Sequence, residues 1–329
     1  MRLIGLEEHF LTPEFLDGPG LSLKKQAQSP DARVAARYSR LVEQLCDVGQ
    51  GRIAAMDAAG IDIQVLSLHA PGVEQLDPAE AVGLARDMND WLSSAIDRHP
   101  DRFAGLAALP TMVPDAAQTE LTRMVRNHGF KGAVINGHTR GRYLDDPFFW
   151  PVLECAERLG VPVYLHPAPP PPPVIESYYT GNFPPEVTAQ LASPSWGWHI
   201  ETAVHVIRLI LGGAFDRFPN LQLVIGHLGE TLPFMLPRLD ATLPGEVTRL
   251  ERSIGDYLRQ NVSYTISGFN FVPTFLDLFL EVGADRIMFS ADYPWGTMES
   301  ARTFLENLPI SPSDKELIAH GNAERLLGF

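Results

Sequence analysis

The chain has 329 residues, of which 45% are hydrophobic and 20% are charged, the composition of a globular protein with a sizeable core. Its net charge of −14 argues against a nucleic acid or an anionic membrane as a partner. Cys46 and Cys155 form no CxxC pair, and no apolar run has the length of a signal peptide core or a bilayer span. The sequence therefore predicts a cytoplasmic protein without disulfides, signal peptide or membrane anchor.

Short apolar segments alternate with helical patterns along the chain. The first apolar segment, residues 3–6, leads without a turn into Glu7, Glu8 and His9. Seven further strands are predicted at residues 61–68, 103–109, 131–135, 161–165, 221–225, 262–266 and 286–290. Helices are predicted over residues 31–48, 51–59, 77–99, 116–127, 146–159, 199–214, 274–282 and 313–327, and around Pro233 and Pro237. Two of these helices begin with a capping-box pattern, at Asp77 and at Ser313.

Strands that alternate with helices predict a parallel sheet, and eight such units favour a (β/α)8 TIM barrel that forms one domain over residues 1–329. The alternative is an open, doubly wound sheet, but no GxGxxG motif follows a predicted strand. The helices between the first two strands form an insertion. The proline-rich stretch from Pro167 to Gly197, after the fifth strand, is expected to be a long loop over the barrel mouth.

Polar side chains follow the predicted strands at the ends where barrel enzymes carry their active sites. They are Glu7, His9, His69, Asn136, His166, His227, Ser267 and Asp292. One strand-end histidine alone is more often structural than a ligand, but four of the ten histidines end strands, which favours a metal site. Since side chains alternate along a strand, Glu7 and His9 share one face and Glu8 takes the other.

Four of these residues suggest a ligand set drawn from the first, fifth and eighth strands. They are Glu7, His9, His166 and Asp292. Two imidazoles and two carboxylates suit Zn²⁺, Mn²⁺ or Fe²⁺ better than Ca²⁺ or Mg²⁺, and such a site keeps positions open for water or substrate.

Four segments make the chain resemble the amidohydrolase superfamily, and within it the non-oxidative aromatic acid decarboxylases typified by γ-resorcylate (2,6-dihydroxybenzoate) decarboxylase. They are LEEHF at 6–10, VYLHP at 163–167, VIGHLGE at 224–230 and FSADYP at 289–294. The resemblance implies that Glu7, His9, His166 and Asp292 bind the metal. It also implies catalytic support from His227, held by Glu230 at i, i+3 spacing at the start of a predicted helix.

The resemblance is closer to the decarboxylases than to the hydrolases of the superfamily, which usually begin with HxH instead of ExH. The chain departs from the resorcylate enzymes at His69, where they carry Asn, and in the proline-rich loop. Both differences lie where the substrate would be recognised.

The implied function is the release of CO2 from a hydroxylated aromatic carboxylic acid, which leaves a phenol. One divalent ion, Zn²⁺ or Mn²⁺, is the expected cofactor, and Asp292 is the expected proton donor to the ring carbon. Arg52 and Arg238 are candidates for binding the anionic groups of the substrate, although surface arginines are common, and Asn136 and His69 are further candidates for contacting it. The resemblance also implies a homodimer or homotetramer.

Two alternatives remain at this stage. A metal-dependent hydrolase of a lactone or amide would use Asp292 as the general base for a water molecule. A non-catalytic metal-binding barrel would keep its binding role in an Asp292→Asn variant. Analysis of the products separates the hydrolase from the decarboxylase.

Overall fold

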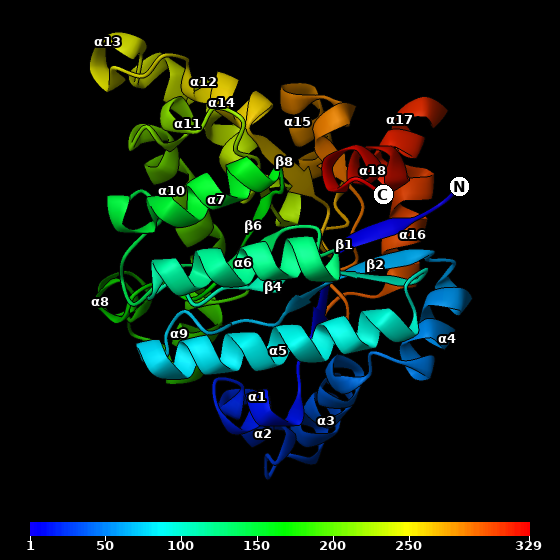
Figure 1. The fold of residues 1–329 in the computed structure, drawn as a ribbon. Helices are drawn as coiled ribbons and strands as arrows, with labels where there is room; N and C mark the ends of the chain where they lie inside the picture. The colour runs from blue at the N-terminus through cyan, green and yellow to red at the C-terminus, as the bar shows by residue number, and fades with distance from the viewer.

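A closed parallel barrel forms the centre of the computed structural model, which describes residues 1–329 (Figure 1). Its strands are β1 (Ile4–Phe10), β2 (Ile63–Leu68), β3 (Phe103–Gly105), β4 (Ala107–Ala108), β5 (Ala133–Asn136), β6 (Val163–His166), β7 (Leu223–Ile225), β8 (Val262–Thr265) and β9 (Ile287–Met288). All neighbouring pairs are parallel, in the orders β1-β2-β3 and β4 to β9.

Backbone hydrogen bonds join these two sheets on both sides. The third predicted strand is divided at Leu106, whose N–H donates to Leu66 O at 2.9 Å, while the N–H of Ala107 donates to Gly132 O at 2.9 Å. On the other side, the N–H of His9 donates to Tyr293 O at 2.9 Å. The α/β barrel predicted from the sequence is therefore the fold that the chain adopts.

Four helices lie between β1 and β2, at the lower edge and right side of Figure 1. They are α1 (Pro13–Asp17), α2 (Leu21–Ala27), α3 (Ala32–Cys46) and α4 (Gln50–Ala59). The sequence predicted α3 and α4 but left residues 11–30 without structure. There Thr12 caps α1 by accepting from the N–H of Phe15, and Pro13 occupies the first turn.

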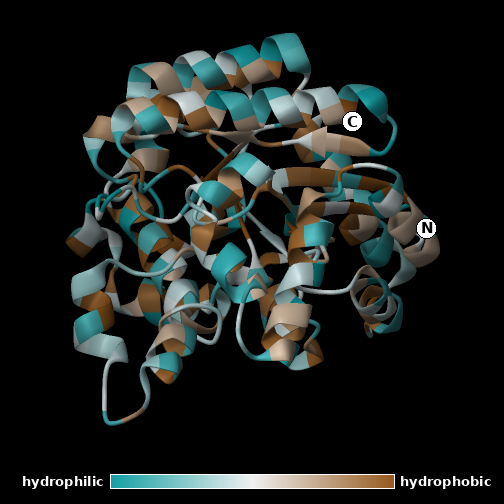
Figure 2. Cartoon of the chain, turned by 90° about the horizontal axis from the view of Figure 1, so that it is seen from below, coloured by the Kyte–Doolittle hydropathy of each residue, from teal (hydrophilic) through white to brown (hydrophobic).

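The remaining helices surround the barrel. They are α5 (Pro78–Arg98), α6 (Pro114–His128), α7 (Trp150–Leu159), α10 (Gly197–Leu211), α11 (Ala214–Arg217), α12 (Leu232–Thr242), α13 (Gly245–Thr248), α14 (Ile254–Gln260), α15 (Val272–Val282), α16 (Met298–Asn307), α17 (Pro312–Glu316) and α18 (Asn322–Leu327). Figure 2 shows brown, hydrophobic strands at the centre and helices of mixed colour around them. No helix has both the length and the apolar character needed to cross a membrane.

The proline-rich stretch differs from the loop that the sequence predicted. It contains α8 (Pro172–Val174), a π-helical turn (Ile175–Tyr179) and α9 (Pro185–Ala192). Pro172 and Pro185 occupy first-turn positions, where a missing N–H removes no helical hydrogen bond. The prolines here therefore begin short helices.

Both predicted capping boxes were wrong in detail. The side chain of Asp77 makes no capping bond to α5 and instead accepts from Arg140 Nη1 at 2.6 Å. Ser311, not Ser313, caps α17, because its Oγ accepts from the N–H of Asp314 at 3.1 Å.

The barrel interior is apolar toward the N-terminal ends of the strands and polar at their C-terminal ends. A cluster that includes Ile4, Leu6 and Tyr164 fills the interior, and Leu327 of α18 joins it. The β1–β2 register shifts between Gly5 and Glu8, which marks a β-bulge. Because the bulge inserts one residue, Glu7 and His9 follow Leu6 into the interior and Glu8 faces outward.

Candidate active site

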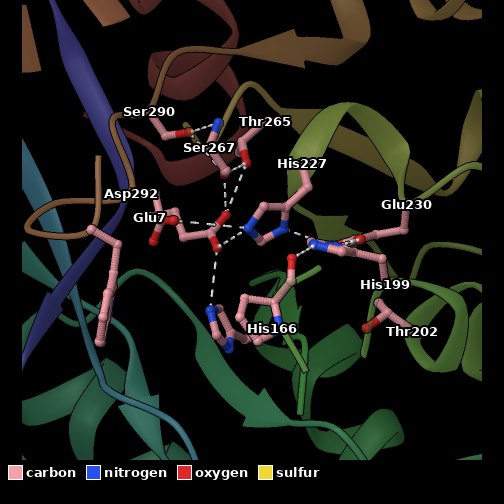
Figure 3. A network of polar contacts seen from close by, with 12 residues as sticks. Glu7, His166, His199, Thr202, His227, Glu230, Thr265, Ser267, Ser290 and Asp292 are labelled. Carbon is pink, nitrogen blue, oxygen red and sulfur yellow. Dashed lines mark hydrogen bonds and ion pairs between the residues drawn. The ribbon is translucent and has the colours of Figure 1, made fainter. Parts of the chain in front are cut away.

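Glu7 lies at the centre of a network of polar side chains at the C-terminal ends of the strands (Figure 3). Its Oε2 accepts hydrogen bonds from the hydroxyl groups of Tyr164 and Ser267, and from Thr265 Oγ1 at 3.2 Å. Its Oε1 is buried without a hydrogen-bond partner, 3.3 Å from His166 Nε2. One oxygen of Glu7 is thus fixed by three hydroxyl groups while the other is left for a ligand.

Two of the other predicted metal ligands, His9 and His166, lie around this free oxygen, and Asp292 lies beside His9. The ligand atoms of Glu7, His9 and His166 all lie within 4.8 Å of one another. His9 Nε2 is 3.1 Å from Asp292 Oδ1, and Ser67 Oγ lies 3.4 Å from His9 Nδ1 on the far side of the ring. A buried carboxylate oxygen without a donor, facing two imidazoles of which one also contacts a second carboxylate, fits a divalent cation such as Zn²⁺ or Mn²⁺.

Glu8 supports this arrangement from outside the barrel. It is buried, and its carboxylate accepts from the N–H groups of Ala291 at 2.9 Å and Tyr293 at 3.2 Å. These bonds hold the turn that carries Asp292, whose φ of 57° lies in the left-handed region. Burial raises the pKa of Glu8 to about 8, although the two N–H groups oppose that rise.

A second polar group adjoins the first and contains a residue that the sequence analysis missed. Glu230 Oε1 lies 2.7 Å from His227 Nδ1, and Glu230 Oε2 lies 2.5 Å from His199 Nδ1. One carboxylate therefore bridges two imidazoles (Figure 3). His199 stands at the start of α10, where the apolar stripe of the helix dominated the sequence pattern and gave no sign of a polar role.

The loop after β7 brings Glu230 to His227 in a conformation that differs from the predicted helix start. His227, Leu228, Glu230 and Thr231 all have positive φ, between 50° and 70°. Such conformations cost free energy in residues other than glycine and persist where the surrounding structure holds them, often at functional sites. The contact between Glu230 and His227 depends on this left-handed loop and not on helical i, i+3 spacing.

Charge in the site is unevenly distributed. Burial acts to lower the pKa of His227, but Glu230, Glu7 and Asp292 overcome it and raise the pKa to about 10. Burial, reinforced by repulsion from Glu7, raises the pKa of Asp292 to about 8. Burial lowers the pKa of His9 to about 3, so His9 is neutral and able to bind a metal.

The remaining predicted site residues divide into two pairs. His69 and Asn136 lie beside the predicted metal ligands. The ring of His69 is 5.4 Å from that of His9, and its Nε2 accepts from Trp295 Nε1 at 2.8 Å. Asn136 pairs in register with His166.

Arg52 and Arg238, the candidates for binding the anionic groups of the substrate, lie in different surroundings. Arg52 is buried, and its Nη2 donates to the backbone carbonyls of His9 at 2.7 Å and Gln44 at 2.9 Å. Its Nε and Nη1 are buried without a hydrogen-bond partner. Arg238 is exposed on α12, and its side chain makes no hydrogen bond or ion pair within the chain.

Comparisons with known proteins agree on one family. A family model described as "Amidohydrolase" matches residues 42–329. The γ-resorcylate decarboxylase of Polaromonas sp. (strain JS666) is 38% identical over 98% of this chain and 97% of its own length.

Two solved structures extend the likeness to the fold. One is a dihydroxybenzoic acid decarboxylase from Polaromonas sp. JS666 with bound manganese and the inhibitor 2-nitroresorcinol; it has a TM-score of 0.88 and 37% identity, and the match covers 99% of this chain and 97% of that one. The other is a 5-carboxyvanillate decarboxylase from Novosphingobium aromaticivorans with bound manganese; it has a TM-score of 0.91 and 34% identity, with coverage of 100% and 97%.

Proposed function

The chain belongs to the amidohydrolase family and is a metal-dependent decarboxylase of hydroxylated aromatic acids, and on this premise we propose that its substrate carries a hydroxyl group ortho to the departing carboxylate. The observation that supports this is the partnerless Oε1 of Glu7 beside His9 and His166, with Asp292 against His9. A cation at that oxygen can be chelated by adjacent carboxylate and hydroxyl groups of one aromatic ring.

In this proposal Glu7, His9, His166 and Asp292 hold one ion, Zn²⁺ or Mn²⁺. When bound, the ion supplies Lewis-acid stabilisation of the phenolate and a template that orients the ring. Two of the relatives bind manganese in their solved structures, which supports Mn²⁺ as one natural occupant.

Asp292 then has a second role as the proton donor to the ring carbon that loses CO2. The substrate phenol supplies the proton as it becomes phenolate. His227 Nε2 lies 3.9 Å from Asp292 Oδ2, within the reach of a small adjustment, so His227 can assist this transfer. Glu230 orients His227, and His199 fixes Glu230 from its other oxygen.

The substrate contacts are proposed for the residues around the cluster. His69 and Asn136 would contact the ring substituents. Arg238 would bind an anionic group across a homodimer or homotetramer interface, because its side chain is exposed and Phe234 on the same helix is 75% exposed. We propose that residues 1–329 act as one domain, in which the helices after β1 and the proline-rich segment after β6 shape the entrance for the substrate.

The test is a panel of aromatic acids incubated with the metal-loaded enzyme while CO2 and the phenol are measured. The panel includes 2,6-dihydroxybenzoate, 5-carboxyvanillate and, as a control without an ortho hydroxyl, 3-hydroxybenzoate. We expect release only from ortho-hydroxylated acids, and a loss of at least about 100-fold in Asp292→Asn, because proton transfer contributes a factor of this order or more.

The matched control for this variant is Asp97→Asn, an exposed position on α5 that should keep full activity. Equal turnover of 3-hydroxybenzoate would refute the ortho-hydroxyl requirement. Full activity of Asp292→Asn would refute the role of Asp292.

A further inference from the structure

A buried carboxyl group beside the proposed site has no part in the mechanism above. Glu74 lies in the turn after β2, is 1% exposed and makes no ion pair. Its Oε1 accepts from the backbone N–H of Asn136 at 2.8 Å. Its neighbour Gln75 donates from Nε2 to His138 O at 2.6 Å. Two adjacent side chains thus connect the loop after β2 to the loop after β5.

The second oxygen of Glu74 faces the side-chain amide of Asn136. A Cβ on Gly72 would lie 2.1 Å from Glu74 Oε2 and 2.5 Å from Asn136 Nδ2, so the two atoms are neighbours against this glycine. Glu74 Oε2 is buried without a hydrogen-bond partner, and the nearby Asn136 side chain opposes the rise that burial causes in the pKa of the Glu74 carboxyl group. Glycine at position 72, with a φ of +64°, is what allows the pair to approach.

The oxygen of the Asn136 side-chain amide is also without a hydrogen-bond partner. Asn136 Oδ1 is buried and accepts no hydrogen bond. Asn136 pairs in register with His166, and paired residues on parallel strands point to the same side of the sheet. Because His166 points to Glu7 in the interior, the Asn136 side chain also faces the barrel mouth.

We propose that Glu74 is a positioning residue that holds Nδ2 of Asn136 and so presents its Oδ1 to the mouth as an acceptor for a second hydroxyl group of the aromatic acid. This inference rests on the proposed function and extends it to the ring substituent on the far side of the carboxylate. A side-chain amide can rotate and exchange the places of its oxygen and nitrogen. An acceptor such as Glu74 on one side of the amide favours the orientation in which Nδ2 faces it, and Oδ1 then faces the barrel mouth.

In this proposal Glu74 accepts from Nδ2 of Asn136 in its ionised form, because both carboxylate oxygens are then acceptors. Burial raises the pKa of Glu74 to about 8, and the N–H groups of Asn136, Glu74 and Val73 oppose this rise. Ligand binding is therefore measured at pH 9, where the carboxylate predominates. Burial also lowers the pKa values of His69 and His138, the two histidines of these loops, so both are neutral there.

The experiment uses one variant that should turn the Asn136 amide over and a second that should restore an acceptor oxygen at the barrel mouth. Binding of 2,6-dihydroxybenzoate and 2-hydroxybenzoate is measured by calorimetry in zinc-loaded protein that carries Asp292→Asn to prevent turnover. We expect the dihydroxy acid to bind about fivefold more tightly, the factor that one net hydrogen bond of ordinary strength gives.

Glu74→Gln keeps an oxygen for the backbone N–H of Asn136 but turns a donor toward its side chain. The Asn136 amide should then rotate, and the preference for the second hydroxyl should disappear. In the double variant Glu74→Gln/Asn136→Asp, one oxygen of the new aspartate accepts from the glutamine and the other faces the mouth, so the preference should return.

Gln75→Leu is the matched control, because it removes the other connection between the two loops without touching the amide of Asn136. A purely structural role for Glu74 would affect both ligands equally and would be reproduced by this control. An unchanged preference in Glu74→Gln overturns the proposal. Failure of the parent to bind either acid overturns the proposed function itself, and this role with it.

Denaturation gives a second readout that needs no ligand. Asn136→Asp alone places two carboxyl groups together and should lower the urea midpoint at pH 9 more than it does in the Glu74→Gln background. Additive effects in this cycle would show that the two side chains do not interact, and would also overturn the proposal.

Discussion

Replacing Glu230 with glutamine tests how the site keeps His227 charged. Three carboxylates raise the pKa of His227 from 6.5 to about 10, which at about 1.4 kcal/mol per pKa unit favours the imidazolium by about 5 kcal/mol. Glu230 is the first of these, with Oε1 2.7 Å from Nδ1. Without its charge, burial should bring the pKa of His227 below 7.

The glutamine is isosteric and can still accept from one imidazole, so the fold should survive while catalysis suffers. We expect the rate of CO2 release at neutral pH to fall about 100-fold, since a proton-transfer group is left neutral and less firmly oriented. The exposed Glu246→Gln on α13 is the control and should match the parent.

The pKa of His227 is followed by NMR of the imidazole Cε1–H in the metal-free protein, with His227→Asn to assign the signal. If His227 in Glu230→Gln still titrates near 10, the assignment of its charge to Glu230 is wrong.

Three other predictions concern support, stability and metal. Glu8→Ala leaves two buried N–H groups of the Asp292 turn without an acceptor. The free energy of unfolding in urea should fall by about 2–4 kcal/mol, and Mn²⁺ binding should weaken about tenfold or more. An unchanged metal affinity would refute the claim that Glu8 supports the metal site. Burial lowers the pKa of His205 to about 3, so unfolding takes up a proton below pH 6.5. The free energy of unfolding should therefore fall by up to about 1.4 kcal/mol per pH unit between pH 6 and 4. His205→Gln should flatten this slope, and an equal slope in the variant would contradict the assignment to His205. Mn²⁺ at 100 times its Kd should raise the free energy of unfolding by about 2.7 kcal/mol, and Glu7→Gln should abolish the increase in Tm.

The arrangement of the barrel was predictable because its signals are local. Each strand is a short apolar run, and the alternation with helices fixes a parallel sheet. The proline-rich segment was mispredicted because prolines disfavour a helix only after its first turn, and the sequence does not show where that turn falls. The bulge in β1 was also invisible, although the alternation of Glu7, Glu8 and His9 was correct.

The cluster of strand-end residues was predictable because barrel topology brings strand ends together wherever they lie in the sequence. His199 and Glu74 were missed for the opposite reason: one opens a helix and the other lies in a turn, and neither position has a fixed relation to the mouth. The backbone contacts of Arg52 could not be predicted, because a guanidinium that bonds to backbone carbonyls looks the same in a sequence as one that binds a ligand.

Anomalous diffraction from a crystal soaked in Mn²⁺ is the most direct test of the metal centre. We predict one strong peak per chain, within coordinating distance of Glu7 Oε1 and the imidazole of His166, with His9 and Asp292 completing the site. A crystal without a peak there, or with its strongest peak at another group of side chains, would contradict the account.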